Sequence, residues 1–252
     1  MVTKIEHFRL TGSRLTDFFS DFNSLFTSLT RSVALNALLY VKGLMICRRR
    51  NCQAMAEELP DADQQRFHHL IGQSKWSAQE VMDAVSVHFY KQLQQLDLED
   101  DICLIVDESG YPKKGKHSVG VQRQYCGAVG KVENCQVGVY GALCGGSLVG
   151  LVQAKLYKSE EECTKIDLAT EIIEHITGTL KVKLSWVCFD AFYGRDAALL
   201  AVLIKKDLEF VADVPQNLHI WTEPFQMRVP VKKAGTKERS APCPNPTGNP
   251  WR

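Results

Sequence analysis

The chain has 252 residues, of which 45% are hydrophobic and 23% charged, with 30 basic and 29 acidic side chains. These values are those of an ordinary globular protein, and the length suits one large domain or two small ones. No apolar run approaches the roughly 18 residues of a membrane span, and the N-terminal residues lack the apolar stretch of a secretory signal. We therefore expect a cytosolic protein without membrane contact.

Charge and cysteine spacing narrow the function classes further. Residues 99–227 carry a net charge of −5 and residues 228–252 a net charge of +5, so a uniformly basic surface for nucleic acid is not expected. Short basic runs are still candidate contacts for nucleic acid, although such a run is usually only a solvated surface. The nine cysteines contain no C-x-x-C pair, so neither a zinc site nor a disulfide framework is indicated.

Residues 1–98 are typical of a small helical domain. Apolar side chains recur every three or four residues from Phe18 to Leu29, which predicts a helix. The segment from Ser77 to Glu80 has the pattern of a capping box at a helix start. Further helices are predicted over residues 33–46, 51–59 and 77–96. Such a domain serves either DNA binding or packing alone, and the sequence leaves both open.

The pattern changes after residue 98. Two continuous apolar runs, Ile102–Val106 and Leu184–Phe189, have the length and composition of buried central strands. Further strands are predicted over residues 134–143, 147–157 and 209–212, and helices over residues 161–177 and 196–205. Strands that alternate with helices indicate an α/β class for residues 99–233. Residues 234–252 contain four prolines and few apolar side chains, so we expect a disordered tail.

Both central runs end in an aspartate followed by a turn: Asp107 in LIVDESGYPKKG and Asp190 in SWVCFDAFYGRD. If the strands are neighbours, the two carboxylates converge and repel each other unless a cation lies between them. Carboxylate oxygens suit Mg²⁺, which can activate water and stabilise a leaving oxygen in phosphoryl transfer. The plainer alternative is that each aspartate caps a turn or a helix. The spacing leaves both interpretations open.

Three lysines, Lys113, Lys114 and Lys116, follow Asp107 beyond a turn that Gly and Pro are expected to fix. Cations beside a metal-binding carboxylate are well placed to hold a phosphate backbone, so these lysines are candidate DNA contacts. Glu108 is a candidate additional ligand, but we expect it to be an outward-facing neighbour, because successive strand side chains alternate between faces.

The stretch DESGYPKKGKHSVGVQRQYCGAVGKVENCQVGVY resembles the core of insertion-sequence transposases with a DDE superfamily endonuclease domain. The segment VCFDAFYGRD is similar to their second-aspartate motif, and EFVADVP is similar to the strand that follows it. The resemblance extends from Ile102 to Val231. It implies an RNase H-like fold, a mixed sheet with flanking helices, and the helical region before it is compatible with the N-terminal domain of such proteins.

The resemblance also implies that Asp107 and Asp190 are two of three catalytic acids and hold two divalent ions, Mg²⁺ or Mn²⁺. Such ions activate water or a DNA 3′-hydroxyl for attack on a phosphodiester. DNA is therefore the expected partner, and a homodimer is left open. The family's glutamate lies on a later helix, and its motif is matched by none of Glu209, Glu223 and Glu238. We therefore expect a C-terminally truncated transposase that lacks the third acid.

Three alternatives follow for the function. The first is a transposase that cuts and joins DNA at insertion-sequence ends, with this chain expected to be an inactive copy. The second is a non-catalytic DNA-binding remnant or regulator of transposition. The third is a decayed, poorly folded gene product, against which a cooperative unfolding transition would count.

Overall fold

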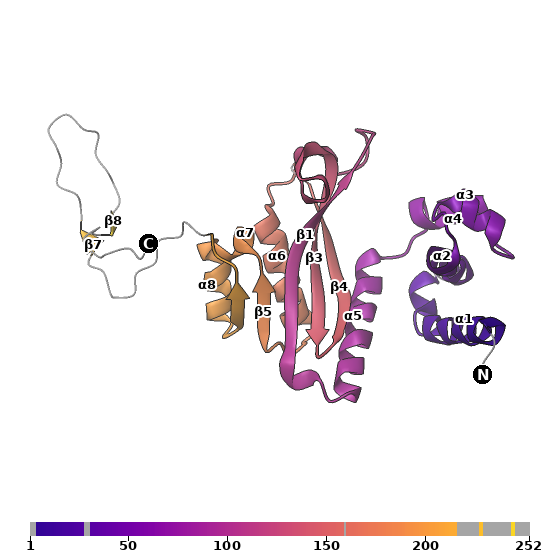
Figure 1. Ribbon diagram of the computed structural model, residues 1–252, viewed down its shortest axis with the longest axis horizontal. Coiled ribbons are helices and arrows are strands. Elements are labelled where there is room, and N and C mark those ends of the chain that lie inside the picture. The colour runs from indigo at the N-terminus through magenta and orange to yellow at the C-terminus, as the bar shows by residue number, and fades with distance from the viewer. Residues whose placement is uncertain (1–3, 28–30, 159, 216–226, 229–242, 245–252) are drawn as a thin grey trace.

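The computed structural model describes residues 4–27, 31–158, 160–215, 227–228 and 243–244 (Figure 1). A group of short helices precedes a mixed sheet that packs against further helices. The first group consists of α1 (Lys4–Ser20), the 3₁₀ turn η1 (Asn23–Phe26), α2 (Ala34–Ile46), α3 (Cys52–Glu58) and α4 (Gln64–Gly72).

The prediction of one continuous helix from Phe18 to Leu29 is wrong, because α1 ends at Ser20 and a 3₁₀ turn follows. A three-residue spacing of apolar side chains suits a 3₁₀ turn as well as an α-helix. Phe19, Phe22 and Phe26 therefore still reach one buried cluster. Helix α4, which was not predicted, begins where the Asp63 carboxylate accepts a hydrogen bond from the Arg66 amide at 2.8 Å.

The sheet has the topology expected from the resemblance. Its strands are β1 (Ile102–Pro112), β2 (Gln122–Cys126), β3 (Lys131–Gly145), β4 (Leu148–Tyr157), β5 (Trp186–Phe189) and β6 (Glu209–Ala212). Strand β2 pairs with the N-terminal part of β3, beyond the main body of the sheet. The remaining order is β4-β3-β1-β5-β6, and β3 alone runs antiparallel to the other four. This arrangement is RNase H-like and confirms the predicted α/β fold class.

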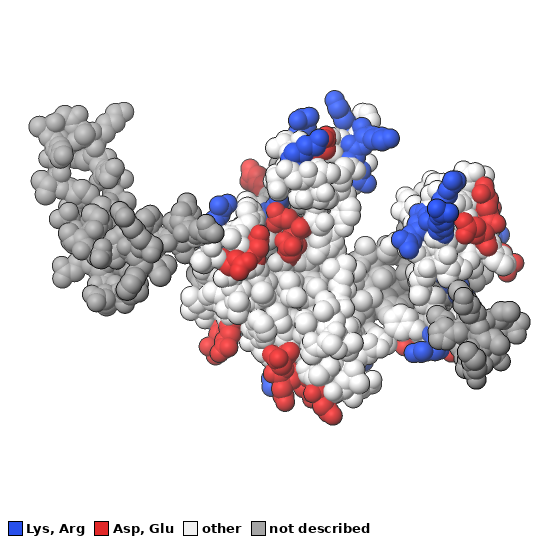
Figure 2. All heavy atoms as spheres, in the orientation of Figure 1, with Lys and Arg blue, Asp and Glu red and all other residues white. Residues whose placement is uncertain are grey.

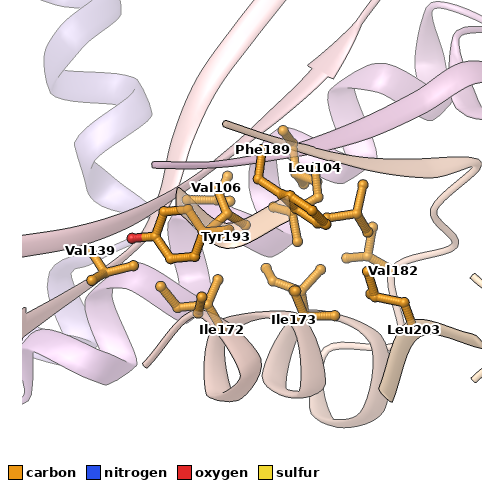
Figure 3. Packing of buried hydrophobic residues seen from close by; sticks show 14 of the residues in the cluster. Leu104, Val106, Val139, Ile172, Ile173, Val182, Phe189, Tyr193 and Leu203 are labelled. Atoms are coloured by element: carbon orange, nitrogen blue, oxygen red, sulfur yellow. The ribbon is translucent and has the colours of Figure 1, made fainter. Parts of the chain in front are cut away.

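Helices pack on one face of this sheet. They are α5 (Ala78–Gln95), α6 (Lys165–Glu174) with the π-helical turn η4 (His175–Thr179), α7 (Ala191–Gly194) and α8 (Ala197–Lys205). Figure 3 shows the core between them and the strands, where the ring of Tyr193 lies between Val106 and Ile172. The other face exposes apolar side chains at 37–64% of their area: Ile105, Val149, Leu151 and Val211.

Ser77 is the N-cap of helix α5, as predicted, since its hydroxyl accepts a hydrogen bond from the Glu80 amide at 3.2 Å, and this is one half of the predicted capping box. Its C-terminal half packs against the sheet, where Leu93 is fully buried. Gly150 of β4 makes room for Phe89, because a Cβ atom there would lie 2.8 Å from the Phe89 ring. A helix on the N-terminal side of residue 98 thus contributes to the core of the sheet, and the domain boundary at residue 98 stays a prediction.

The predictions for the C-terminal region concern residues that lie largely outside the described ranges. The predicted disordered tail, residues 234–252, is described only at Cys243–Pro244 (β8), which pairs with Met227–Arg228 (β7). Eight of the nine cysteines, those from Cys47 to Cys188, are free thiols. None of the helices in the described ranges is long and apolar enough to span a membrane.

Candidate active site

Asp107 lies on strand β1, but the strand does not end there as predicted. It continues to Pro112, paired with β3, because Gly110 lets Cys126 approach the strand: a Cβ atom at Gly110 would lie 2.8 Å from the Cys126 Sγ. What ends at Asp107 is the pairing with β5, whose last registered pair is Val106 with Phe189. Asp107 therefore lies where the parallel neighbour stops and the strand edge becomes accessible.

Asp190 directly follows β5 and is the N-cap of helix α7. Its Oδ1 accepts hydrogen bonds from the amides of Phe192 at 2.9 Å and Tyr193 at 3.4 Å. The alternative interpretation of this residue as a helix cap is therefore confirmed. It does not exclude a second role, because no described donor occupies Oδ2.

The two aspartates lie side by side. Each is the next residue after a registered pair of adjacent parallel strands, and such strands are about 5 Å apart. Side chains alternate along a strand, so Asp107 shares the face of Ile105 and Asp190 the face of Cys188, a registered pair. Burial of the Asp107 carboxyl is the largest cause that raises its pKa, and the negative charges of Asp190 and Glu108 raise it further. The strand register and the effect of Asp190 on the Asp107 pKa thus place the two aspartates at the same edge of the sheet.

The donor atoms at this edge fit a divalent cation. Asp107 Oδ1 accepts the Glu108 amide at 2.7 Å, so each aspartate uses one oxygen for the backbone and keeps Oδ2 without a described donor. Hard, charged oxygens of this kind are ligands that Mg²⁺ and Mn²⁺ accept. Within the described ranges, however, no group of three or more His, Cys, Asp or Glu residues is arranged to hold a metal.

The third acid expected from the resemblance is not supplied by Glu209. This residue begins β6 and pairs with Trp186, at the end of the parallel strands opposite to Asp190. Glu223 and Glu238 lie outside the described residues. Glu108 lies on the opposite face from Asp107, as the alternation along the strand predicts, but it is not outward-facing, because its side chain is only 24% exposed. Its Oε1 accepts a hydrogen bond from Lys165 Nζ at 2.9 Å.

The lysines are farther from Asp107 than a turn at Gly110 would place them. Lys113 follows Asp107 by six residues of extended strand, which spans about 20 Å. The loop that bears Lys113, Lys114 and Lys116 is held by Asn134, whose side-chain amide donates to the carbonyls of Lys113 at 2.6 Å and Gly115 at 2.9 Å. Figure 2 shows Lys and Arg side chains gathered at this end of the sheet.

Sequence reasoning missed two residues beside the site, Lys165 and Tyr193. Lys165 forms an ion pair with Glu108, and Tyr193 is fully buried below the two aspartates, next to Glu108. A usable signal existed for Lys165, since a lysine at the first position of a helix opposes the helix dipole and calls for another partner. Tyr193 lies only three residues after Asp190, but nothing in the sequence indicates that its side chain turns inward.

Comparison with known proteins gives a consistent set of matches. Residues 24–160 match the family profile described as DDE superfamily endonuclease, a range that contains Asp107 and ends before Asp190. Over 213 residues, the chain is 27% identical to the probable transposase for insertion sequence element IS701 of Microchaete diplosiphon. The matched region covers 81% of this chain and 54% of that protein. The chain thus spans about half the length of the curated relative it matches.

Among solved structures, the matches include several of the Mos1 transposase. The paired-end complex with left transposon end is 15% identical, with a TM-score of 0.25, over 69% of this chain and 57% of that chain. The Mos1 strand transfer complex is 16% identical, with a TM-score of 0.27, over 72% of this chain and 59% of that chain.

Proposed function

Because the chain belongs to the DDE superfamily endonuclease family, we propose that its Asp107–Asp190 edge is the metal-binding site of a DNA transposase. The reaction would be cutting and joining of DNA phosphodiesters at the ends of an insertion sequence. The observation that carries this proposal is the position of both aspartates after one registered strand pair, each with Oδ2 unused by the described residues.

In this proposal, Asp107 and Asp190 are the residues that would hold Mg²⁺ or Mn²⁺. A bound divalent ion supplies charge stabilisation at the phosphodiester and activates water or a 3′-hydroxyl. The protein contributes rigid ligand placement, since Asp107 is fixed by β1 and β3 on one side and Asp190 by the first turn of α7. Two carboxylates neutralise less metal charge than three, so we propose that this chain alone binds the ion weakly and cleaves DNA slowly or not at all.

The test is metal-dependent nicking of DNA that carries the ends of the insertion sequence. Nicking by the wild-type chain with Mg²⁺ or Mn²⁺ should be lost in Asp107→Asn and in Asp190→Asn. A matched control is Asp207→Asn, because Asp207 lies in a turn before β6 with a φ of 54°, which asparagine adopts readily. Nicking that is equal in the wild type and both site variants would remove the proposal.

The same proposal assigns DNA contacts to Lys113, Lys114 and Lys116. These residues lie in the loop between β1 and β2, and this loop, strand β2 and the N-terminal part of β3 form an arm that also carries Arg123 and Lys131. At about 3.4 Å of duplex per base pair, the distance of about 20 Å from Asp107 places the arm about six base pairs from the reacting phosphate. The arm would hold the backbone of the duplex while the aspartates face the bond that is cut.

A second candidate is DNA binding without cleavage, as a remnant or regulator of transposition. It is favoured by the combination of a basic arm with two, rather than three, acids among the described residues. Salt-sensitive DNA binding without metal-dependent nicking would support this candidate, whereas no binding at low salt would reject it. Sedimentation with and without DNA would test the homodimer, which also stays a proposal.

A further inference from the structure

A small polar cluster connects the two aspartates on the side of the sheet that faces helix α6. It consists of Glu108, Lys165 and Tyr193, which come from β1, α6 and α7. Glu108 is bonded to Asp107 through the backbone, and Tyr193 belongs to the short helix that Asp190 caps. Each aspartate is thus joined within three residues to a member of the cluster.

Lys165 is held in place from several directions. Its ammonium group lies 2.9 Å from Glu108 Oε1, 5.6 Å from the ring centroid of Phe192 and 6.0 Å from that of Tyr157. The side chains of Lys165 and Glu108 are only 18% and 24% exposed, so solvent screens this ion pair less than a surface pair. The start of α6 is fixed by a capping box between Thr164 and Asp167.

The position of Lys165 is unfavourable for the helix itself. A cation in the first turn opposes the helix macrodipole and costs about 0.3–1 kcal/mol. Its contacts with Glu108 and the two aromatic rings are the features that offset this cost. The presence of a lysine at this position is therefore explained by its contact with Glu108 and not by the stability of the helix.

Tyr193 completes the cluster. Its hydroxyl is buried beside Glu108, and a phenol donates a hydrogen bond through its O–H. Neither this hydroxyl nor Glu108 Oε2 meets hydrogen-bond geometry with any described group. Leaving both buried and unpaired would cost about 1–3 kcal/mol each, so we take them as partners that a small rotation brings together.

Helix α7 cannot move freely to accommodate a change. Gly194 packs so closely against the end of β6 that a Cβ atom there would lie 2.5 Å from the Asp213 carbonyl oxygen. The Asp190 carboxylate, which accepts the amides of Phe192 and Tyr193, is bound to this same rigid turn. A displacement of Tyr193 would therefore be transmitted to Asp190.

We propose that Glu108, Lys165 and Tyr193 are positioning residues that set the separation and orientation of Asp107 and Asp190 without touching the metal. This inference rests on the proposed function for its purpose, although the mechanical link exists in the chain alone. Partners that orient metal ligands from behind typically change metal affinity about 10- to 100-fold when removed.

Two conservative variants test the positioning role of this cluster. Tyr193→Phe removes only the hydroxyl, and Lys165→Met removes the charge but keeps an unbranched apolar stem against the aromatic rings. Tyr90→Phe is the control for the first, because Tyr90 packs against the same core from α5. Lys155→Met is the control for the second, because Lys155 forms an ion pair with Glu171 of α6 at 2.7 Å.

The first measurement is metal-free hydrogen exchange in the full chain, read at the Glu108 and Phe192 amides that donate to the two aspartates. We expect both amides to exchange about tenfold faster in Tyr193→Phe and Lys165→Met, with core amides and both controls unchanged. If both amides exchange at the wild-type rate in both variants, the cluster does not position the two aspartates.

The second measurement is Mn²⁺ affinity, followed by electron paramagnetic resonance of the free ion. We expect both variants to bind Mn²⁺ about tenfold more weakly than the wild type and the controls. If both variants bind Mn²⁺ with wild-type affinity, the proposed positioning role of the cluster is wrong, whereas the proposed metal site is unaffected. Conversely, if Asp107→Asn leaves Mn²⁺ binding unchanged, the proposed metal site is wrong. The metal-free exchange rates alone then test the positioning role of the cluster.

Discussion

His175 Nε2 lies 2.7 Å from Asp83 Oδ1, and this contact ties the end of helix α6 to helix α5. The same carboxylate oxygen accepts hydrogen bonds from Gln79 at 2.8 Å and from the fully buried Gln153 of β4 at 3.0 Å. Three elements that are distant in sequence therefore meet at one partly buried carboxylate. Such a network stabilises the packing of α5 on the sheet only while Asp83 is ionised.

The stability of the chain should consequently depend on pH through Asp83. Burial is the largest influence on its pKa and raises it, but the hydrogen bonds from His175, Gln79 and Gln153 together lower the pKa below the ordinary value. A lowered folded-state pKa means that the stabilisation is complete above the unfolded pKa of about 3.9 and is lost as the pH falls through the folded value. We expect Asp83→Asn to cost about 1–3 kcal/mol at pH 7 and much less near pH 2, by urea unfolding.

The control for this change is Glu171→Gln, which removes the Lys155 ion pair whose glutamate is 51% exposed. Exposed pairs contribute about 0–1 kcal/mol, so this variant should unfold close to the wild type at both pH values. A cost for Asp83→Asn that is the same at low and neutral pH would contradict the ionised network.

Helix α5 should unfold together with the sheet rather than with the helices before it. Leu93 is fully buried in the sheet's core, whereas Leu96, one turn later, is 57% exposed. Leu93→Ala should therefore cost about 2–5 kcal/mol, and Leu96→Ala less than about 0.5 kcal/mol. Denaturant unfolding followed at residues of the sheet gives the comparison, and equal midpoints for the two variants would show that α5 is not part of that core.

The sequence predicted those parts of the fold that depend on local patterns. The apolar runs at Ile102–Val106 and Leu184–Phe189 became neighbouring strands, and their terminal aspartates converged, because parallel strands present corresponding residues at the same level. The cap at Ser77 was also visible, since a capping oxygen lies within three residues of its donor.

What could not be predicted depends on contacts between distant residues. Gly110 and Pro112 are typical of a turn, yet β1 runs through them because the packing of Cys126 requires a glycine there. The Lys165–Glu108 and His175–Asp83 pairs join residues far apart in the chain, and no local spacing indicates either of them. The site was thus predicted at its two aspartates and missed in the groups that support them.

The lysines of the arm should determine the salt dependence of DNA binding. Each phosphate contact contributes about −0.9 to the slope of log K against log salt. The combined variant Lys113→Gln, Lys114→Gln, Lys116→Gln should therefore bind duplex DNA more weakly and with a slope that is shallower by about 2 to 3.

The control for the arm changes three exposed lysines outside it, Lys181, Lys183 and Lys205. Their replacement by glutamine should leave the slope within about one contact of the wild type, because Lys181 and Lys183 follow the turn η4 and Lys205 is the last residue of α8, so none of them belongs to the arm. Gel shifts or fluorescence anisotropy at several salt concentrations provide the slopes. An equal decrease in both triple variants would indicate general attraction instead of a defined contact surface.

The close packing of α7 on β6 predicts that the metal site is sensitive to a single methyl group. In Gly194→Ala, the new Cβ atom would lie 2.5 Å from the Asp213 carbonyl oxygen, and the backbone there cannot turn aside as a flexible side chain can. We expect a loss of about 1–3 kcal/mol in unfolding free energy together with weaker Mn²⁺ binding, because α7 and its cap Asp190 must shift together. Gly127→Ala is the matched control, since a Cβ atom at Gly127 meets nothing within 4 Å. If Gly194→Ala behaves like this control in both measurements, α7 is not the rigid support of Asp190 that its packing indicates.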